Sequence, residues 1–246
     1  MNMASAVHFS QPKGEAMIFR DREEAGRLLA SKLESYQDDP NGLILALPRG
    51  GVAIGYELAL ALHLPLDVVI ARKLGAPDNP EYALGALSET GALYLNPDAV
   101  ETFGLSPAQL EALIAAAREE IFRRQRLYRN ESPLATVAGR TVILVDDGIA
   151  TGATFFATIE AISALSPRRL VAAIPVAPQD NVSPLRSRVD DLVVLATPEP
   201  FLAVGHHYHS FPQVDDAEVL AYLKAAKQSL AARASPLIET RPMSDA

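Results

Sequence analysis

Two adjacent carboxylates, Asp146 and Asp147, stand directly after the apolar run 142–145 and before a loop with two glycines and two threonines. Such an apolar run is typical of a strand that is buried on both faces of a parallel sheet. Glycine lets backbone N–H groups approach an anion, and the amino end of a following helix adds partial positive charge. The loop is therefore predicted to bind a phosphate. Its residues are Gly148, Ile149, Ala150, Thr151, Gly152, Ala153 and Thr154.

The acidic doublet needs a separate explanation, because carboxylates that pointed at a phosphate would repel it. Vicinal sugar hydroxyls donate hydrogen bonds that carboxylates accept well. A phosphorylated sugar fits both parts, with its hydroxyls on Asp146 and Asp147 and its phosphate on the loop 148–154. The chain has no Gly-Lys-Ser/Thr and no Gly-x-Gly-x-x-Gly, which excludes a P-loop and a dinucleotide fingerprint. The plainer alternative is that the doublet only caps the helix that follows.

Two further segments are expected at the same edge of the sheet. Residues 48–51 follow the apolar run 43–47, and residues 72–73 follow the apolar run 67–71. In open sheets of parallel strands, ligands bind outside the carboxyl ends of the strands. The first segment offers one guanidinium and two glycines to a diphosphate, and the second offers two cations to a departing anion. An ordinary turn and solvated surface charges are the alternatives. These candidate residues are Arg49, Gly50, Gly51, Arg72 and Lys73.

The order of apolar runs and amphipathic stretches predicts an α/β fold with a doubly wound, mostly parallel sheet. Asp21 and Ser106 are the expected N-caps of two helices. A long loop is expected at 72–92, because that stretch is rich in Gly and Pro, with a hairpin that pairs 84–88 with 92–95 across a turn at 89–91. Residues 1–16 and 231–246 are expected to be a flexible lead-in and a flexible tail around one domain, 17–230. Strands are expected at 43–47, 67–71, 141–145, 170–176 and 191–196, and helices at 52–62, 107–128, 154–165 and 218–230.

Composition narrows the function classes. The chain has 246 residues, of which 49% are hydrophobic and 21% charged, as in a globular protein. It has no cysteine, so disulfides and cysteine-bound metals are excluded. A net charge of −8 argues against a broad nucleic-acid surface. No apolar run approaches the roughly 18 residues that span a bilayer, and no secretory signal is evident at the start. We therefore expect a cytoplasmic protein with no membrane partner.

Residues 142–154 resemble the phosphoribosyl pyrophosphate (PRPP) signature of the type I phosphoribosyltransferases, and the resemblance extends over about 20–225. The strings 79–86 and 198–205 are similar to a group of bacterial proteins named only as phosphoribosyltransferases. The resemblance implies a Rossmann-like sheet with a small hood, to which about 74–95 and 197–215 contribute. It implies that 48–51 is the pyrophosphate loop, often with a cis peptide entering Arg49, and that 74–92 is a flexible loop that closes over the site.

The implied activity is transfer of the 5-phosphoribosyl group from PRPP to a nitrogen acceptor, with a nucleobase favoured, and release of pyrophosphate. The implied catalytic residues are Asp146, Asp147 and Lys73. Mg²⁺ is the implied cofactor, held mainly by PRPP and reached by the two carboxylates directly or through water. Phe201 and Tyr208 are candidates to stack on the base. A homodimer is also implied.

Position 150 departs from the pattern of one group of family members, so the acceptor and the activity have alternatives. In members that use 6-oxopurines, an aspartate three residues after the doublet assists proton transfer, and this chain has Ala150 there. Glu81 and Glu89 are carboxylates that could replace it, and the alternative is that both are surface residues. A PRPP-binding regulator without turnover is the second hypothesis. A phosphatase with Asp146 as nucleophile is the third, although the chain lacks Asp-x-Asp spacing there.

Overall fold

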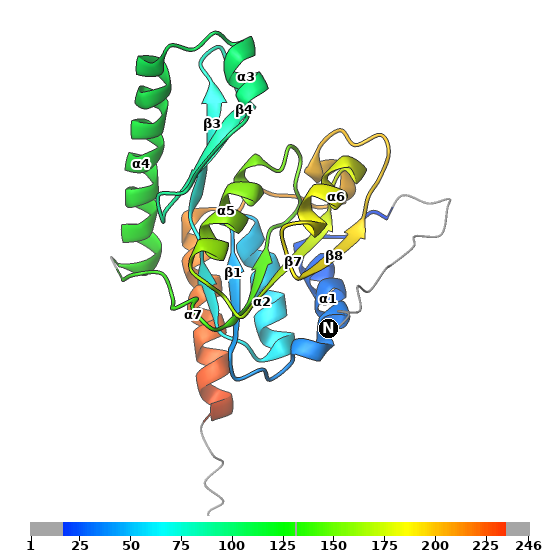
Figure 1. Ribbon diagram of the computed structural model, residues 1–246. Helices are drawn as coiled ribbons and strands as arrows, with labels where there is room; N and C mark the ends of the chain where they lie inside the picture. The colour runs from blue at the N-terminus through cyan, green and yellow to red at the C-terminus, as the bar shows by residue number, and fades with distance from the viewer. Residues whose placement is uncertain (1–16, 131, 235–246) are drawn as a thin grey trace, which may run out of the picture.

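The computed structural model describes residues 17–130 and 132–234, which are built around a five-stranded parallel sheet (Figure 1). The strand order is β2-β1-β6-β7-β8, and every neighbouring pair is parallel. The register places Ala46 beside both Val68 and Val145, so three strands end at the same level. The strands are β1 (Gly42–Ala46), β2 (Leu66–Val68), β6 (Thr141–Val145), β7 (Arg169–Val176) and β8 (Asp191–Ala196).

Helices cover both faces of this sheet because alternate side chains of each strand point to opposite sides. Ile44 and Ile143 belong to a core shared with α1, α2 and α7, whereas Leu45 and Leu144 belong to a core shared with α5 and α6. The doubly wound α/β fold is therefore confirmed. The helices are α1 (Arg22–Lys32), α2 (Gly51–Leu62), α5 (Ala153–Ala164), α6 (Gln179–Arg186) and α7 (Asp216–Ala234), with short 3₁₀ turns η1 (Glu34–Tyr36) and η2 (Val204–His207).

The ends of the chain were only partly predicted. Helix α7 continues to Ala234, so residues 231–234 are helical where a tail was expected. Residues 1–16 and 235–246 lie outside the described residues. None of the helices within 17–130 and 132–234 is long and apolar enough to cross a bilayer.

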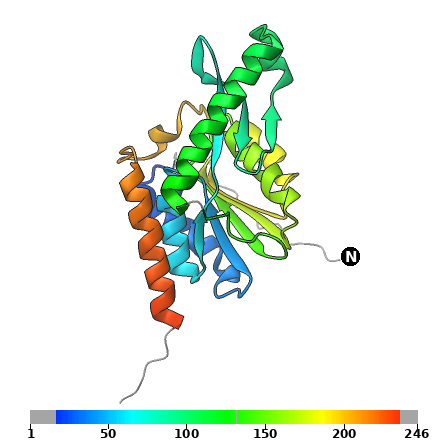
Figure 2. The ribbon, with the colours of Figure 1, turned by 90° about the vertical axis from the view of Figure 1, so that its left-hand side faces the viewer.

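Residues 71–129 form an arm that rises from one end of the central sheet (Figures 1 and 2). A three-stranded antiparallel sheet, in the order β3-β4-β5, packs against the long helix α4. The predicted hairpin of 84–88 with 92–95 is confirmed, because β4 and β5 pair there. The long loop predicted around it was wrong, because β3 and β4 pair along most of that stretch. The elements of the arm are β3 (Ala71–Ala76), β4 (Asn79–Ser88), β5 (Leu93–Leu95), α3 (Pro97–Thr102) and α4 (Pro107–Arg129).

A buried ion pair ties the two ends of the arm together. The Arg129 guanidinium at the end of α4 donates to Glu89 Oε2, and the two side chains are only 6% and 3% exposed. Gln125 Nε2 donates to the same carboxylate at 2.9 Å, and Glu89 Oε1 accepts the Ile70 N–H at 2.8 Å. Two nitrogens of Arg129, Nε and Nη1, are buried without a partner within the described ranges. Glu89 is therefore a structural carboxylate of the arm and not a surface residue or a base-binding group.

Replacing Arg129 with methionine should destabilise the protein strongly, because it leaves the buried Glu89 carboxylate without its cation. The expected loss is about 3–5 kcal/mol in the free energy of unfolding, measured by urea-induced unfolding. Arg118→Met on the exposed face of the same helix is the matched control and should change stability by less than about 0.5 kcal/mol. Equal stabilities of the two variants would contradict a structural role for the pair.

Candidate active site

The two loops predicted to bind the sugar phosphate lie side by side because β1 and β6 are neighbours in register. The backbone N–H of Leu47 donates to the carbonyl of Val145 at 3.0 Å, which continues the ladder beyond the end of β1. Residues 48–51 and 146–154 therefore leave the sheet at the same edge. The Pro48–Arg49 peptide bond is cis, as the resemblance implies.

The loop 148–154, here named the phosphate loop, surrounds a pocket of about 260 Å³. Gly148 and Gly152 have φ of +155° and +78°, which favour glycine. The first part of the loop is fixed by two hydrogen bonds, since Ile149 N–H donates to the Val176 carbonyl and Asn181 Nδ2 donates to the Ala150 carbonyl. The first N–H groups of α5 have no partner within that helix, so they can bind an anion. The pocket is lined by Lys73, Asp146, residues 148–155 and Val204.

Gly50 and Gly51 belong to residues 48–51, here named the pyrophosphate loop after its predicted ligand, and they lie against the acidic doublet. A Cβ at Gly50 would lie 1.8 Å from Asp147 Oδ2, and a Cβ at Gly51 would lie 3.0 Å from Asp146 Oδ1. Their backbones therefore pack directly on the acidic doublet. The sequence analysis explained these glycines by the approach of their backbone to an anion. Close packing against two carboxylates is a second reason why glycine is needed at both positions.

The carboxylates of the doublet have different surroundings. Asp146 lines the phosphate-loop pocket, and its Oδ1 accepts the N–H of Asp147 at 2.9 Å. Asp147 Oδ2 accepts from Arg22 Nε at 2.8 Å, and its side chain is 15% exposed. Burial, and then the charge of Asp147, raise the pKa of the Asp146 carboxyl well above its usual range. Burial also raises the pKa of Asp147, and the Arg22 guanidinium opposes that rise.

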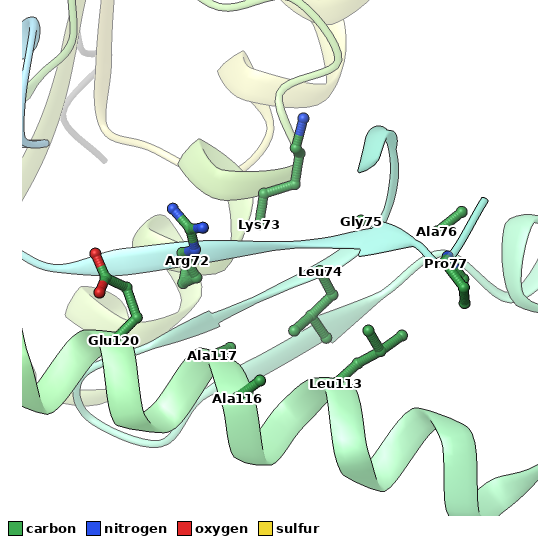
Figure 3. Close-up of a pocket in the computed structure, with 10 residues that line it drawn as sticks. All are labelled: Arg72, Lys73, Leu74, Gly75, Ala76, Pro77, Leu113, Ala116, Ala117 and Glu120. Carbon is green, nitrogen blue, oxygen red and sulfur yellow. The ribbon is translucent and has the colours of Figure 1, made fainter. Parts of the chain in front are cut away.

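The two basic residues that were predicted to act together both line the pocket between β3 and α4, but only Lys73 also lines the phosphate-loop pocket. Both belong to β3 in the arm and do not follow a strand of the central sheet. Lys73 extends away from α4, whereas Leu74 points toward it (Figure 3), and Lys73 lines the phosphate-loop pocket. Arg72 lies with Glu120 along a second pocket of about 590 Å³ between β3 and α4. Lys73 is therefore the better placed of the two cations.

Tyr208 was wrongly predicted to stack on a base. It is 6% exposed, and Phe19 and Phe211 pack against its ring with centroids 5.3 and 4.8 Å away. Its hydroxyl donates to the Asp147 carbonyl at 2.6 Å, so it supports the doublet instead. Phe201 is partly exposed and stacks on His207, and it stays a candidate.

Arg22 is the site residue that the sequence analysis missed. It is the first residue of α1, directly after the N-cap Asp21, and it reaches the doublet from a distant part of the chain. One signal was available: a cation in the first turn of a helix opposes the helix dipole. A nearby carboxylate offsets that cost, and in the structure Asp147 provides it.

The donor set suits a magnesium ion that is held mainly by its substrate. Mg²⁺ takes oxygen ligands and keeps several waters, and Asp146 offers a carboxylate to the pocket. Asp147 is engaged by Arg22, so Asp146 is the better direct ligand. Among the described residues, no group of three or more His, Cys, Asp or Glu side chains could bind a metal alone.

The comparisons with known proteins agree with this geometry. The model of the phosphoribosyl transferase domain matches residues 18–203. A Mycobacterium tuberculosis protein named "Putative phosphoribosyl transferase Rv0571c" is 40% identical over 214 residues, which are 87% of this chain and 48% of that protein. The crystal structure of TT1426 from Thermus thermophilus has a TM-score of 0.70 and 43% identity, and the match covers 84% of this chain and 98% of that one.

The fold and the two loops define a protein with a phosphoribosyl transferase domain. The chain belongs to the phosphoribosyl transferase family, because the family model covers most of its length. It spans about half the length of the curated relatives that it matches. Membership argues against a phosphatase that uses Asp146 as its nucleophile.

Replacing Gly152 with alanine should weaken binding of ribose 5-phosphate, because the added Cβ would lie 2.6 Å from the Phe156 ring and would distort the phosphate loop. We expect the dissociation constant to rise about tenfold or more, measured by calorimetry. Gly139→Ala is the matched control, since φ is +73° there and nothing lies within 4 Å of its Cβ. Both variants share the backbone cost of about 1–2 kcal/mol, so equal affinities would contradict the assignment of the loop.

Replacing Asp146 with asparagine should stabilise the protein above neutral pH. The pKa of the Asp146 carboxyl is higher in the folded than in the unfolded protein. Its contribution to stability is therefore fully present below the unfolded-state pKa and is lost as pH rises through the folded-state pKa. Thermal unfolding should therefore show a higher Tm for the variant at pH 8 and converging values near pH 4. A variant that is less stable than the wild type at pH 8 would contradict the cause given for the pKa shift.

Proposed function

We propose that this chain binds PRPP across the two loops and transfers its 5-phosphoribosyl group to a nitrogen acceptor, for which a nucleobase is the favoured class. The observation that supports this most is the junction of β1 and β6, where the phosphate loop, the acidic doublet and the pyrophosphate loop meet. The 5-phosphate binds the phosphate loop, and the ribose hydroxyls donate to Asp146, the member of the doublet that lines the pocket. The diphosphate lies along residues 48–51, which pack on Asp147.

The reaction breaks the bond from ribose C1 to pyrophosphate oxygen and forms a bond from C1 to the acceptor nitrogen. The electron pair of the broken bond leaves with pyrophosphate, and the nitrogen loses its proton to solvent or to that anion. Positive charge develops on the ribose ring in the transition state, so the carboxylate of Asp146 stabilises it, and Lys73 stabilises the departing anion. Bound Mg²⁺ would neutralise further charge on the diphosphate.

Binding of PRPP without turnover is the second candidate. Ala150 argues against a 6-oxopurine acceptor but not against turnover, because residues 150–152 resemble the adenine and uracil members. Among the residues that line the phosphate-loop pocket, Lys73 and Asp146 are the titratable ones. The pocket therefore contains no side chain in the position of the aspartate that assists proton transfer in the 6-oxopurine members. Magnesium dependence, assembly as a homodimer and a cytoplasmic location stay predictions from the resemblance.

The experiment measures PRPP binding by calorimetry with Mg²⁺ and pyrophosphate release across a panel of nucleobases. We expect PRPP to bind and at least one base to release pyrophosphate. Asp146→Asn should reduce release about a hundredfold or more, because it removes the carboxylate that faces the ribose. Asp98→Asn on the exposed first turn of α3 should have no effect.

Each result decides between the candidates. Binding of PRPP with no release from any base would favour the regulator. Absence of PRPP binding by the folded wild-type protein would overturn both candidates.

A further inference from the structure

Three contacts fix the guanidinium of Arg22 between helix α1, the acidic doublet and the segment 208–214. Nε donates to Asp147 Oδ2 at 2.8 Å, and Nη1 donates to the Pro212 carbonyl at 2.7 Å. The Cζ atom lies 3.8 Å from the centroid of the Phe211 ring, so the guanidinium plane is also covered by an aromatic face. The Arg22 side chain is only 10% exposed, and these three contacts hold its guanidinium in place.

The ion pair of Arg22 and Asp147 lies directly beneath the pyrophosphate loop. A Cβ at Gly50 would lie 1.8 Å from Asp147 Oδ2 and 3.2 Å from Arg22 Nε, so the backbone of Gly50 touches both partners. Gly50 is also the N-cap of α2, where φ is −60° and ψ is −37°. The position of the pair therefore determines where the first turn of α2 and its N–H groups can lie.

The other carboxylate of the doublet has a different orientation. Asp146 lines the phosphate-loop pocket, and the described lining of that pocket does not include Asp147. The two adjacent residues thus serve different loops, since one faces the sugar phosphate and the other supports the diphosphate segment.

We propose that Arg22 is a positioning residue that holds Asp147 beneath Gly50 and thereby sets the pyrophosphate loop. This inference rests on the proposed function and assigns a role that the sequence motif does not contain. Removal of Arg22 leaves a buried carboxylate without its cation. The carboxylate then moves or takes up a proton, and Gly50 loses the surface on which it packs. The phosphate loop, which is fixed separately by Val176 and Asn181, keeps its shape.

The experiment compares two ligands that occupy different halves of the site. Ribose 5-phosphate probes the phosphate loop, and inorganic pyrophosphate with Mg²⁺ probes the pyrophosphate loop, each titrated by calorimetry. Arg22→Met should raise the dissociation constant for pyrophosphate about tenfold or more, the size expected for lost hydrogen bonds to a charged group. Its affinity for ribose 5-phosphate should stay within about twofold of the wild type.

Two further variants control this comparison. Arg27→Met removes another arginine of α1, one that is exposed and paired with Glu23, and should leave both affinities unchanged. Arg22→Lys keeps the charge beside Asp147 and should restore most of the pyrophosphate affinity. A general loss of packing would lower both affinities together and would not be rescued by lysine.

The outcomes separate this inference from the proposed function. If Arg22→Met weakens binding of neither ligand, or of both equally, the inference is overturned. The proposed function still stands in that case, provided that the wild-type protein binds PRPP. A folded wild-type protein that binds neither probe nor PRPP overturns the function and the inference together. If Arg22→Met fails to fold, as judged by circular dichroism, Arg22→Gln takes its place under the same criteria.

Discussion

The site depends on burying two adjacent carboxylates at the end of a parallel strand. Asp146 and Asp147 leave β6 at a point where the pyrophosphate loop packs on them, and burial raises both of their pKa values. Ionised carboxylates in such surroundings are costly unless a cation or hydrogen-bond donors compensate them. Arg22 compensates the Asp147 carboxylate, and the N–H of Asp147 donates to the Asp146 carboxylate. The N-terminal helix is therefore part of the site, although it is far from the motif in sequence.

The same constraint explains the small residues around the doublet. Gly50 and Gly51 have no side chain, so the carboxylates can pack against their backbone. A Cβ at Gly148 would lie 2.5 Å from Val204 Cγ1, so glycine at that position lets the segment after β8 pack closely. Larger side chains at these positions would push the two loops apart. The sequence motif of glycines and acids is thus one packed unit, in which the polar groups that bind ligand are fixed by the backbones that surround them.

Much of this arrangement could be predicted, because its signals are local. The apolar runs 43–47 and 141–145 indicated buried parallel strands, and adjacent parallel strands deliver their following loops to one edge. The hairpin of the arm was predicted, but β3 and the first part of β4 were missed because Gly75 and Pro77 are typical of turns. In the structure Gly85 lies inside β4, where a Cβ would be 2.1 Å from the Tyr94 carbonyl. Close approach of a neighbouring strand, which only the tertiary fold reveals, accounts for that glycine.

Tyr208 was given the wrong role and Arg22 was missed because the contacts of both residues depend on the tertiary fold. An aromatic residue in an irregular segment can stack on a ligand or fill a core, and only its neighbours decide between the two. Phe19 and Phe211 cover the ring of Tyr208, and the same Phe211 covers Arg22. The contacts of Phe19 with Tyr208 and of Arg22 with Phe211 do not follow from spacing, because the partners lie far apart in the chain.

The arm also changes how the site can exclude water. A flexible loop at 74–92 was expected to fold over the substrate, but β3 and β4 already pair along this stretch. Refolding it would break that ladder and uncover Leu74 and Leu84, which are buried in the core shared with α4. Lys73 is therefore presented to the pocket by a preformed sheet, and the buried Glu89–Arg129 pair holds the base of that sheet in place. The same sheet also packs on α5, the helix that begins at the phosphate loop, so the arm and the loop are held against each other.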